Sequence, residues 1–167
     1  LRRIFPEAWR DFASTIPEKE RSDILGNFHR RLLDPDPAIH LPAARAWSRY
    51  EGACSTLHPS PETVAAFGED SIAFALARIE THYFTNGNFM ADNALLDNID
   101  KCSGLPCLII QGRYDMICPI VTADELHRVW PRSEIVIVPD GGHSAMDPGV
   151  RESLVRATER YKQTLGA

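Results

Sequence analysis

Two short apolar runs separated by one helix-length segment constrain this chain more than any other feature. The runs cover residues 107–110 and 134–138, and glycine or proline bounds each of them. Short, continuous runs rich in β-branched residues are typical of strands buried on both faces of a parallel sheet. A helix is predicted between them at 120–129, and a final amphipathic helix carries Val150 and Ala157. The order strand, helix, strand, helix predicts an α/β fold.

Two strands alone cannot cover their own faces and edges, so these residues resemble the last edge of a larger sheet. An unpaired apolar edge is a surface to which another chain adds. We therefore expect self-association through this exposed edge, or a partner chain that supplies the remaining strands.

The first 95 residues have a different character, because their apolar residues recur with helical spacing. One helix is predicted over 17–33 and a second along the face of Trp47, Tyr50, Cys54 and Leu57. A third is predicted over 72–83, with a buried face formed by Ile72, Leu76, Ile79 and Tyr83. The proline-rich segments 34–37 and 58–61 are interpreted as breaks between helices.

Composition excludes several classes of protein. The 167 residues carry a net charge of -5 and no basic cluster that would favour nucleic-acid binding. No apolar run is long enough to cross a membrane. The four cysteines have neither the pairing nor the histidine spacing of zinc sites, so we expect free thiols and no metal. Such cysteines are typical of the reducing cytoplasm, which is the predicted location. No cofactor is expected. Because the chain begins at Leu1 rather than Met, we expect that the true amino terminus lies outside it.

Asp115 and His143 follow the two predicted strands, where loops converge at one edge of a parallel sheet. An aspartate that orients an imidazole, which in turn faces a serine hydroxyl, makes a nucleophile from a weak alcohol. Gly141 and Gly142 are expected to let the backbone bend sharply and present His143. The alternatives are that Asp115 caps the next helix and that His143 is an ordinary loop residue.

An ordered series of motifs resembles the carboxyl-terminal half of the proline iminopeptidase (prolyl aminopeptidase) family. The resemblance covers essentially the whole chain. In the strand region it rests on Gly112-Arg113-Tyr114-Asp115, Cys118-Pro119, Trp130-Pro131 and Gly142-His143-Ser144-Ala145. In the helical region it rests on Phe5-Pro6-Glu7-Ala8-Trp9, Ile16-Pro17, Ala46-Trp47, Tyr50-Glu51-Gly52, Glu80, His82-Tyr83-Phe84 and Asn86.

The resemblance implies the carboxyl-terminal portion of an α/β-hydrolase: a helical cap or lid over 1–95, then the last two parallel strands and their helices over 96–167. Asp115 is then the triad acid and His143 the general base. Glu51 and Glu80 are implied to hold the cationic amine of a peptide with amino-terminal proline, and Phe84 to line the pocket for its ring.

No Gly-x-Ser-x-Gly turn, which carries the nucleophile of such enzymes, occurs in the sequence. We therefore expect a fragment of a serine aminopeptidase that is inactive alone. Two alternatives stay open. One is another α/β-hydrolase, such as an esterase, amidase or epoxide hydrolase. The other is a non-catalytic split subunit or binding module.

Overall fold

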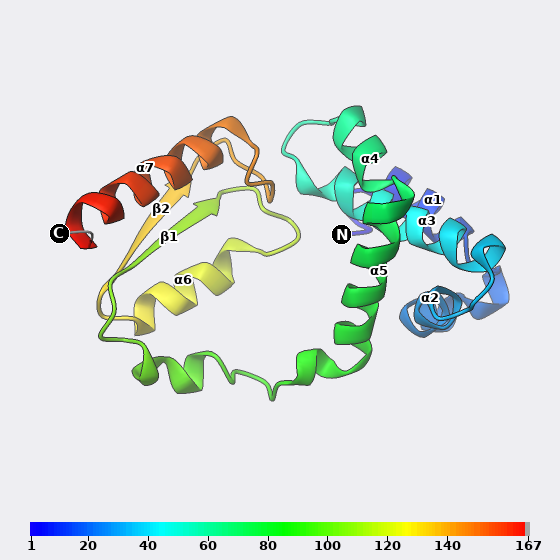
Figure 1. Ribbon diagram of the computed structural model, residues 1–167, viewed down its shortest axis with the longest axis horizontal. Coiled ribbons are helices and arrows are strands. Elements are labelled where there is room, and N and C mark those ends of the chain that lie inside the picture. The colour runs from blue at the N-terminus through cyan, green and yellow to red at the C-terminus, as the bar shows by residue number, and fades with distance from the viewer. Residues whose placement is uncertain (166–167) are drawn as a thin grey trace. The chain divides into compact units, whose positions relative to one another are not determined.

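The computed structural model describes residues 1–165, which form two compact units. The first unit comprises residues 1–54 and 59–91, and the second comprises residues 55–58 and the chain from Asp92 onward. The first unit is wholly helical, and the second holds both strands (Figure 1).

Five α-helices and two short 3-10 turns build the first unit. The capping residues explain where three of these helices begin, because each supplies an oxygen to an otherwise unpaired backbone N–H. The helices are α1 (Pro6–Ser14), α2 (Ile24–Leu32), α3 (Pro37–Ser55), α4 (Pro61–Phe67) and α5 (Asp70–Thr85), and the 3-10 turns are Glu18–Asp23 and Gly87–Phe89.

The segments interpreted as breaks are also helix starts. Asp36 Oδ1 accepts a hydrogen bond from the backbone N–H of Ala38 at 2.8 Å, so α3 begins at Pro37 rather than near Trp47. Ser60 Oγ accepts from the N–H of Thr63 at 3.2 Å and begins α4, a helix that the sequence patterns did not predict. In both cases proline occupies the first helical position, where its missing N–H costs nothing.

The predicted helix over 17–33 is two elements. After Pro17, the six residues Glu18–Asp23 form a 3-10 helix. Asp23 then accepts a hydrogen bond from the N–H of Gly26 at 3.0 Å and starts α2. The short helix α1 was not predicted either, and α3 ends at Ser55, before Leu57.

Aromatic rings and alanines form the core of the first unit. The rings of Phe12 and Phe28 stack at 4.4 Å between centroids and 7° between planes, and Phe28 is fully buried. Ala43 and Ala44 on α3 and Ala73 and Ala77 on α5 are buried in the same cluster. Small side chains of this kind let helices approach closely.

The buried face of α5 is not the predicted one. Ile72, Ile79 and Tyr83 are 48%, 59% and 48% exposed in this chain, whereas Ala73, Ala77 and Thr81 are buried. Ser48 Oγ donates to the carbonyl of Ala73 at 3.2 Å, a contact that only a close approach of α3 and α5 allows. The helix was predicted correctly, but its large apolar residues do not mark the packed side.

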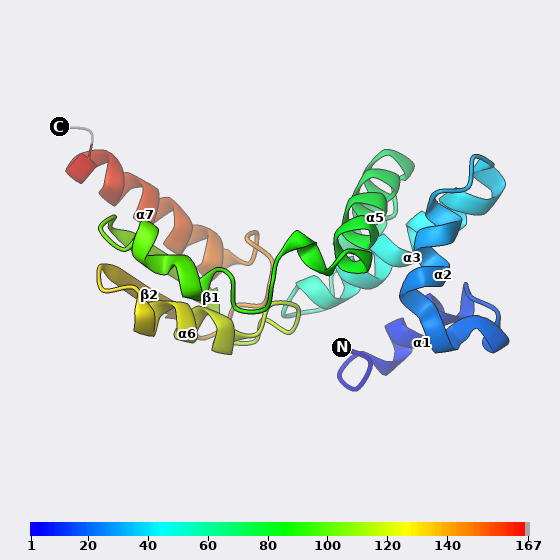
Figure 2. The same ribbon diagram turned by 90° about the horizontal axis from the view of Figure 1, so that it is seen from below.

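The second unit confirms the predicted order of strands and helices. Strands β1 (Cys107–Gly112) and β2 (Ser133–Val138) pair in parallel, and α6 (Ile120–Val129) and α7 (Pro148–Leu165) cover opposite faces of the pair (Figure 2). A 3-10 helix over Leu96–Lys101 precedes β1. This arrangement is an α/β one, preceded in the chain by helices.

The strands are less buried than predicted. Most residues of β1 are half-buried, and on β2 Val136 and Ile137 are 40% and 38% exposed. The reason is that, among the described residues, each strand has a single neighbour. Their apolar composition suits a wider sheet than these two strands form.

Candidate functional site

Asp115 and His143 contact each other directly. His143 Nδ1 lies 3.0 Å from Asp115 Oδ2 and 3.2 Å from Asp115 Oδ1. The parallel register explains the meeting, since Gly112 and Val138, the last residues of β1 and β2, are paired and both following loops leave the sheet at the same end. The Asp115 side chain is 8% exposed and that of His143 is 32% exposed.

The loop after β1 holds the Asp115 carboxylate in place. Its Oδ1 atom accepts hydrogen bonds from the backbone N–H groups of Ile117 at 3.0 Å and Cys118 at 2.8 Å. Helix α6 begins only at Ile120, after Pro119 in the capping position, so Asp115 does not cap that helix. With its carboxylate held in this way, Asp115 can accept a hydrogen bond from a protonated Nδ1 of His143. This contact leaves Nε2 on the side of the ring that faces away from Asp115.

The loop after β2 fixes the His143 backbone. The N–H groups of His143 and Ser144 both donate to the carbonyl of Ser55 at 2.9 Å. The N–H of Gly142 donates to Asp147 Oδ2 at 2.7 Å. The imidazole therefore projects from an anchored loop.

Close packing explains the glycines around this pair. The chain turns after β2, where the N–H of Gly141 donates to the carbonyl of Val138 at 3.3 Å, but neither Gly141 nor Gly142 has a positive φ that would itself require glycine. Instead, a Cβ atom on Gly112 would lie 2.0 Å from the carbonyl oxygen of Gly142, and one on Gly142 would lie 2.7 Å from the backbone nitrogen of Leu57. The two loops meet at a distance that only glycine permits.

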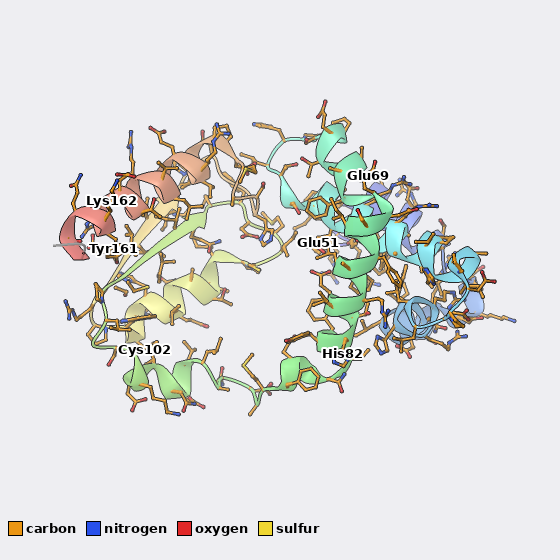
Figure 3. The ribbon with its side chains drawn as sticks, viewed as in Figure 1. Glu51, Glu69, His82, Cys102, Tyr161 and Lys162 are labelled. Atoms are coloured by element: carbon orange, nitrogen blue, oxygen red, sulfur yellow. The ribbon has the colours of Figure 1, made fainter. Side chains whose placement is uncertain are left out.

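A second cluster of candidate residues lies within the first unit, between α3 and α5. Trp47 and Glu51 are one turn apart on α3, as are Glu80 and Phe84 on α5. Trp47 Nε1 donates a hydrogen bond to Glu80 Oε2 at 2.7 Å, and the rings of Trp47 and Phe84 are 6.3 Å apart. Figure 3 labels Glu51 in this cluster.

Glu51 and Glu80 are close enough to interact strongly. Burial raises the pKa of Glu51 to about 8, and the hydrogen bond and charge repulsion with Glu80 act in the same direction. A carboxyl group in this state is largely protonated at neutral pH. Trp47 was assigned to the helical core by its spacing, and no sequence signal indicated that its indole N–H reaches a carboxylate across the helix pair.

Phe84 is 49% exposed, so its ring can contact a molecule from solvent. Thus the structure brings Asp115 to His143 within the second unit, and Glu51, Glu80 and Phe84 together around Trp47 within the first.

Other kinds of site find no support in the described part of the chain. Residues 1–165 contain no group of three or more histidine, cysteine, aspartate or glutamate side chains that could hold a metal ion. No helix in this range has the length and apolar character needed to cross a bilayer. No disulfide joins the four cysteines of this range; Cys54 is buried and Cys118 is exposed.

Comparison with known proteins gives a consistent result. Residues 89–165 match the family model described as TAP-like protein. The chain is 45% identical over 159 residues to a probable proline iminopeptidase of Leptolyngbya boryana, covering 95% of the chain and 50% of that protein. It is 45% identical over 165 residues to the proline iminopeptidase of Arabidopsis thaliana, covering 98% of the chain and 43% of that protein. Against the Xanthomonas citri proline iminopeptidase the identity is 43%, over 95% of the chain and 51% of the relative.

The chain thus spans about half the length of the curated relatives that it matches. The similarity extends through both units, because nearly all of the chain is covered.

The close approach of Gly112 to the loop after β2 predicts that adding one methyl group at Gly112 destabilises the second unit. Gly112→Ala places Cβ 2.0 Å from a backbone oxygen and must push the loops apart. We expect it to lower the free energy of unfolding of the second unit by about 2–4 kcal/mol, measured by chemical denaturation. Gly104→Ala is the matched control, because nothing lies within 4 Å of its added Cβ. Equal effects of the two substitutions would contradict the proposed close packing.

The raised pKa of Glu51 predicts a pH-dependent stability. Because the folded-state pKa is about 8 and the ordinary value is 4.5, the folded chain binds more protons between these values, and its stability falls as pH rises through this window. Glu51→Gln is therefore expected to stabilise the chain by about 1–3 kcal/mol at pH 9, after allowance for solvent screening, and to have little effect at pH 5.

Thermal unfolding followed by circular dichroism at both pH values measures this difference. The control is Glu18→Gln, which makes the same change at an exposed position. A stabilisation that is the same at pH 5 and pH 9 would show that Glu51 does not carry the shifted ionisation.

Proposed function

Because this chain is homologous to the carboxyl-terminal half of the proline iminopeptidases, which are α/β-hydrolases, we propose that it supplies the acid, the base and the amine-binding carboxylates of a serine aminopeptidase. The enzyme would release proline from the amino terminus of peptides. The observation that carries the proposal is the contact of His143 Nδ1 with Asp115 Oδ2 at 3.0 Å, beyond the ends of two paired strands.

In this mechanism Asp115 accepts a hydrogen bond from Nδ1–H of His143, and His143 Nε2 takes the proton of a serine hydroxyl. The serine oxygen attacks the carbonyl of the prolyl residue and forms an acyl-enzyme as the peptide amine leaves with the proton from His143. Water then hydrolyses the ester with His143 again as the base. Asp115 stabilises the imidazolium formed in each step.

The serine must come from outside these 167 residues, which contain no Gly-x-Ser-x-Gly turn. The backbone N–H that follows the nucleophile and binds the oxyanion would come with it. The chain alone is then inactive, and a segment that carries the serine turn is its partner. The outer edges of β1 and β2, which have no strand neighbour among the described residues, are the natural place for further strands to pair.

Glu51 and Glu80 explain the preference for a free amino terminus. A prolyl secondary ammonium has two N–H donors, and two carboxylates can each accept one of them in a charge-assisted hydrogen bond. An internal amide nitrogen brings no positive charge to such a site, which makes the enzyme an exopeptidase. Phe84, one turn after Glu80, offers an apolar ring against the pyrrolidine. In this proposal residues 1–95 form the cap and residues 96–167 complete the hydrolase core, in the reducing environment of the cytoplasm.

Labelling with a fluorophosphonate probe tests the acid and base roles. The chain is mixed with the separately produced amino-terminal half of a proline iminopeptidase, which carries the serine. We expect serine labelling in the mixture and none in either part alone. His143→Ala should abolish the labelling, and His58→Ala, an exposed histidine in the same unit, should retain it. Labelling of the isolated chain would contradict the proposal.

Substrate choice separates a peptidase from an esterase or amidase, with which it shares the Asp–His pair. In the completed enzyme Glu80→Gln should lower kcat/KM for a prolyl arylamide by about 10- to 100-fold, because a charge-assisted hydrogen bond to the ammonium is lost. Cleavage of a simple ester without an amine should be retained. Glu69→Gln, an exposed glutamate that directly precedes the same helix, is the control. Equal loss with both substrates would favour the other hydrolases.

A further inference from the structure

The contact between Trp47 and Glu80 indicates how the two carboxyl groups differ before any ligand arrives. Trp47 is held by the aromatic core: its ring lies 5.5 Å from that of Phe28 at 72°, and 5.8 Å from that of Phe12 at 67°. Phe28 is fully buried and Phe12 is 5% exposed, so these rings hold the orientation of the indole. Its N–H is thereby directed at Glu80 rather than free to rotate toward solvent.

A hydrogen bond between two carboxyl groups needs one proton, because an ionised carboxylate can only accept. Glu80 Oε2 already accepts the N–H of Trp47 at 2.7 Å, which makes Glu80 the acceptor side of the pair. Burial of Glu51, with its hydrogen bond to Glu80 and the repulsion between the two charges, raises its pKa to about 8. Glu51 is therefore largely protonated at neutral pH and can donate the hydrogen bond.

We propose that Trp47 is a positioning residue: its N–H fixes Glu80 as the hydrogen-bond acceptor of the pair, Glu51 is the donor, and binding of a substrate ammonium releases the Glu51 proton to solvent. The inference rests on the proposed function, since the ammonium is that of the amino-terminal residue. The O–H bond of the Glu51 carboxyl breaks, its proton passes to water or buffer, and both carboxylates then accept N–H hydrogen bonds from the cation. The net charge of the occupied site is the same as before.

The other titratable groups near Glu51 do not compete for this role. Tyr50 and Cys54 lie on the same helix, and their pKa values are raised to about 12 and about 11, mainly by burial. Glu7 and the amino group of Leu1 act on Cys54 from the amino-terminal side. From α5 the group that acts on Glu51 is Glu80.

Carboxyl carbon NMR of the free chain tests the role of Trp47 without any ligand. In the unaltered chain the Glu51 carboxyl should titrate near pH 8. Trp47→Phe keeps an aromatic ring and removes the N–H, so Glu80 is no longer fixed as the acceptor and the Glu51 titration should shift. Trp9→Phe makes the same change at another ring of the cluster, 5.4 Å from Phe12, and should leave the Glu51 titration unchanged. An unchanged Glu51 titration in Trp47→Phe would overturn the proposal.

Calorimetry with L-prolinamide tests the coupling to binding. At pH 7, titrations of the chain in phosphate and in Tris, which differ in ionisation enthalpy, should show release of about one proton per ligand bound. Glu51→Gln should abolish this release, and Trp47→Phe should weaken binding about tenfold. N-acetyl-prolinamide, which has no cationic amine, should not bind. Binding of L-prolinamide without proton release, or no binding, would overturn the coupling.

Failure of this inference is distinguishable from failure of the proposed function. The titrations and calorimetry use this chain alone and need no serine, whereas fluorophosphonate labelling and arylamide cleavage need the completed enzyme. If Trp47→Phe folds poorly, Glu51→Gln still decides the outcome, because proton release that persists in that variant assigns the proton to another group and overturns the proposal.

Discussion

The parallel pairing of β1 with β2 is the constraint on which the arrangement of the candidate triad residues depends. Gly112 and Val138 end their strands as register partners, so the residues that follow start from neighbouring points. Asp115 and His143 then need only short loops to meet. A shift of register would move one loop along the sheet and separate the side chains, and the tight contact of Gly112 with Gly142 resists such a shift. The contact between Asp115 and His143 thus follows from backbone pairing before any side chain is considered.

The carboxyl groups in the two units are held in contrasting ways. Asp115 is almost fully buried, yet two backbone N–H groups and the imidazole surround its oxygens, so its hydrogen-bond acceptors are satisfied within the loop. Glu51 and Glu80 face each other instead, with an indole N–H on one of them. A satisfied carboxylate suits a residue that orients a base through many cycles. A pair of carboxyls with one proton between them suits the recognition of a cation, because the arriving charge relieves their repulsion.

The strand region could be predicted from the sequence almost residue by residue, whereas the helical region could not. Continuous apolar runs bounded by glycine and proline are a local signal, and α6 was predicted with its observed bounds. The same proline motifs misled in the first unit, because Asp36-Pro37 and Ser60-Pro61 both end one segment and begin the next. A proline after a capping residue marks a helix start as often as a break, and only the backbone hydrogen bonds distinguish the two.

The face of α5 shows why packing was harder to predict than secondary structure. Spacing alone favoured Ile72, Ile79 and Tyr83 as the buried side, since large apolar residues dominate most cores. The close approach of α3 to α5 reverses this preference, because Ala73, Ala77 and Ser48 leave room for backbone contact and larger side chains do not. That approach also brings Trp47 within reach of Glu80. The cluster of Trp47, Glu51, Glu80 and Phe84 thus depends on small residues that lie near it on the same two helices, a relation between distant positions that no single helical pattern contains.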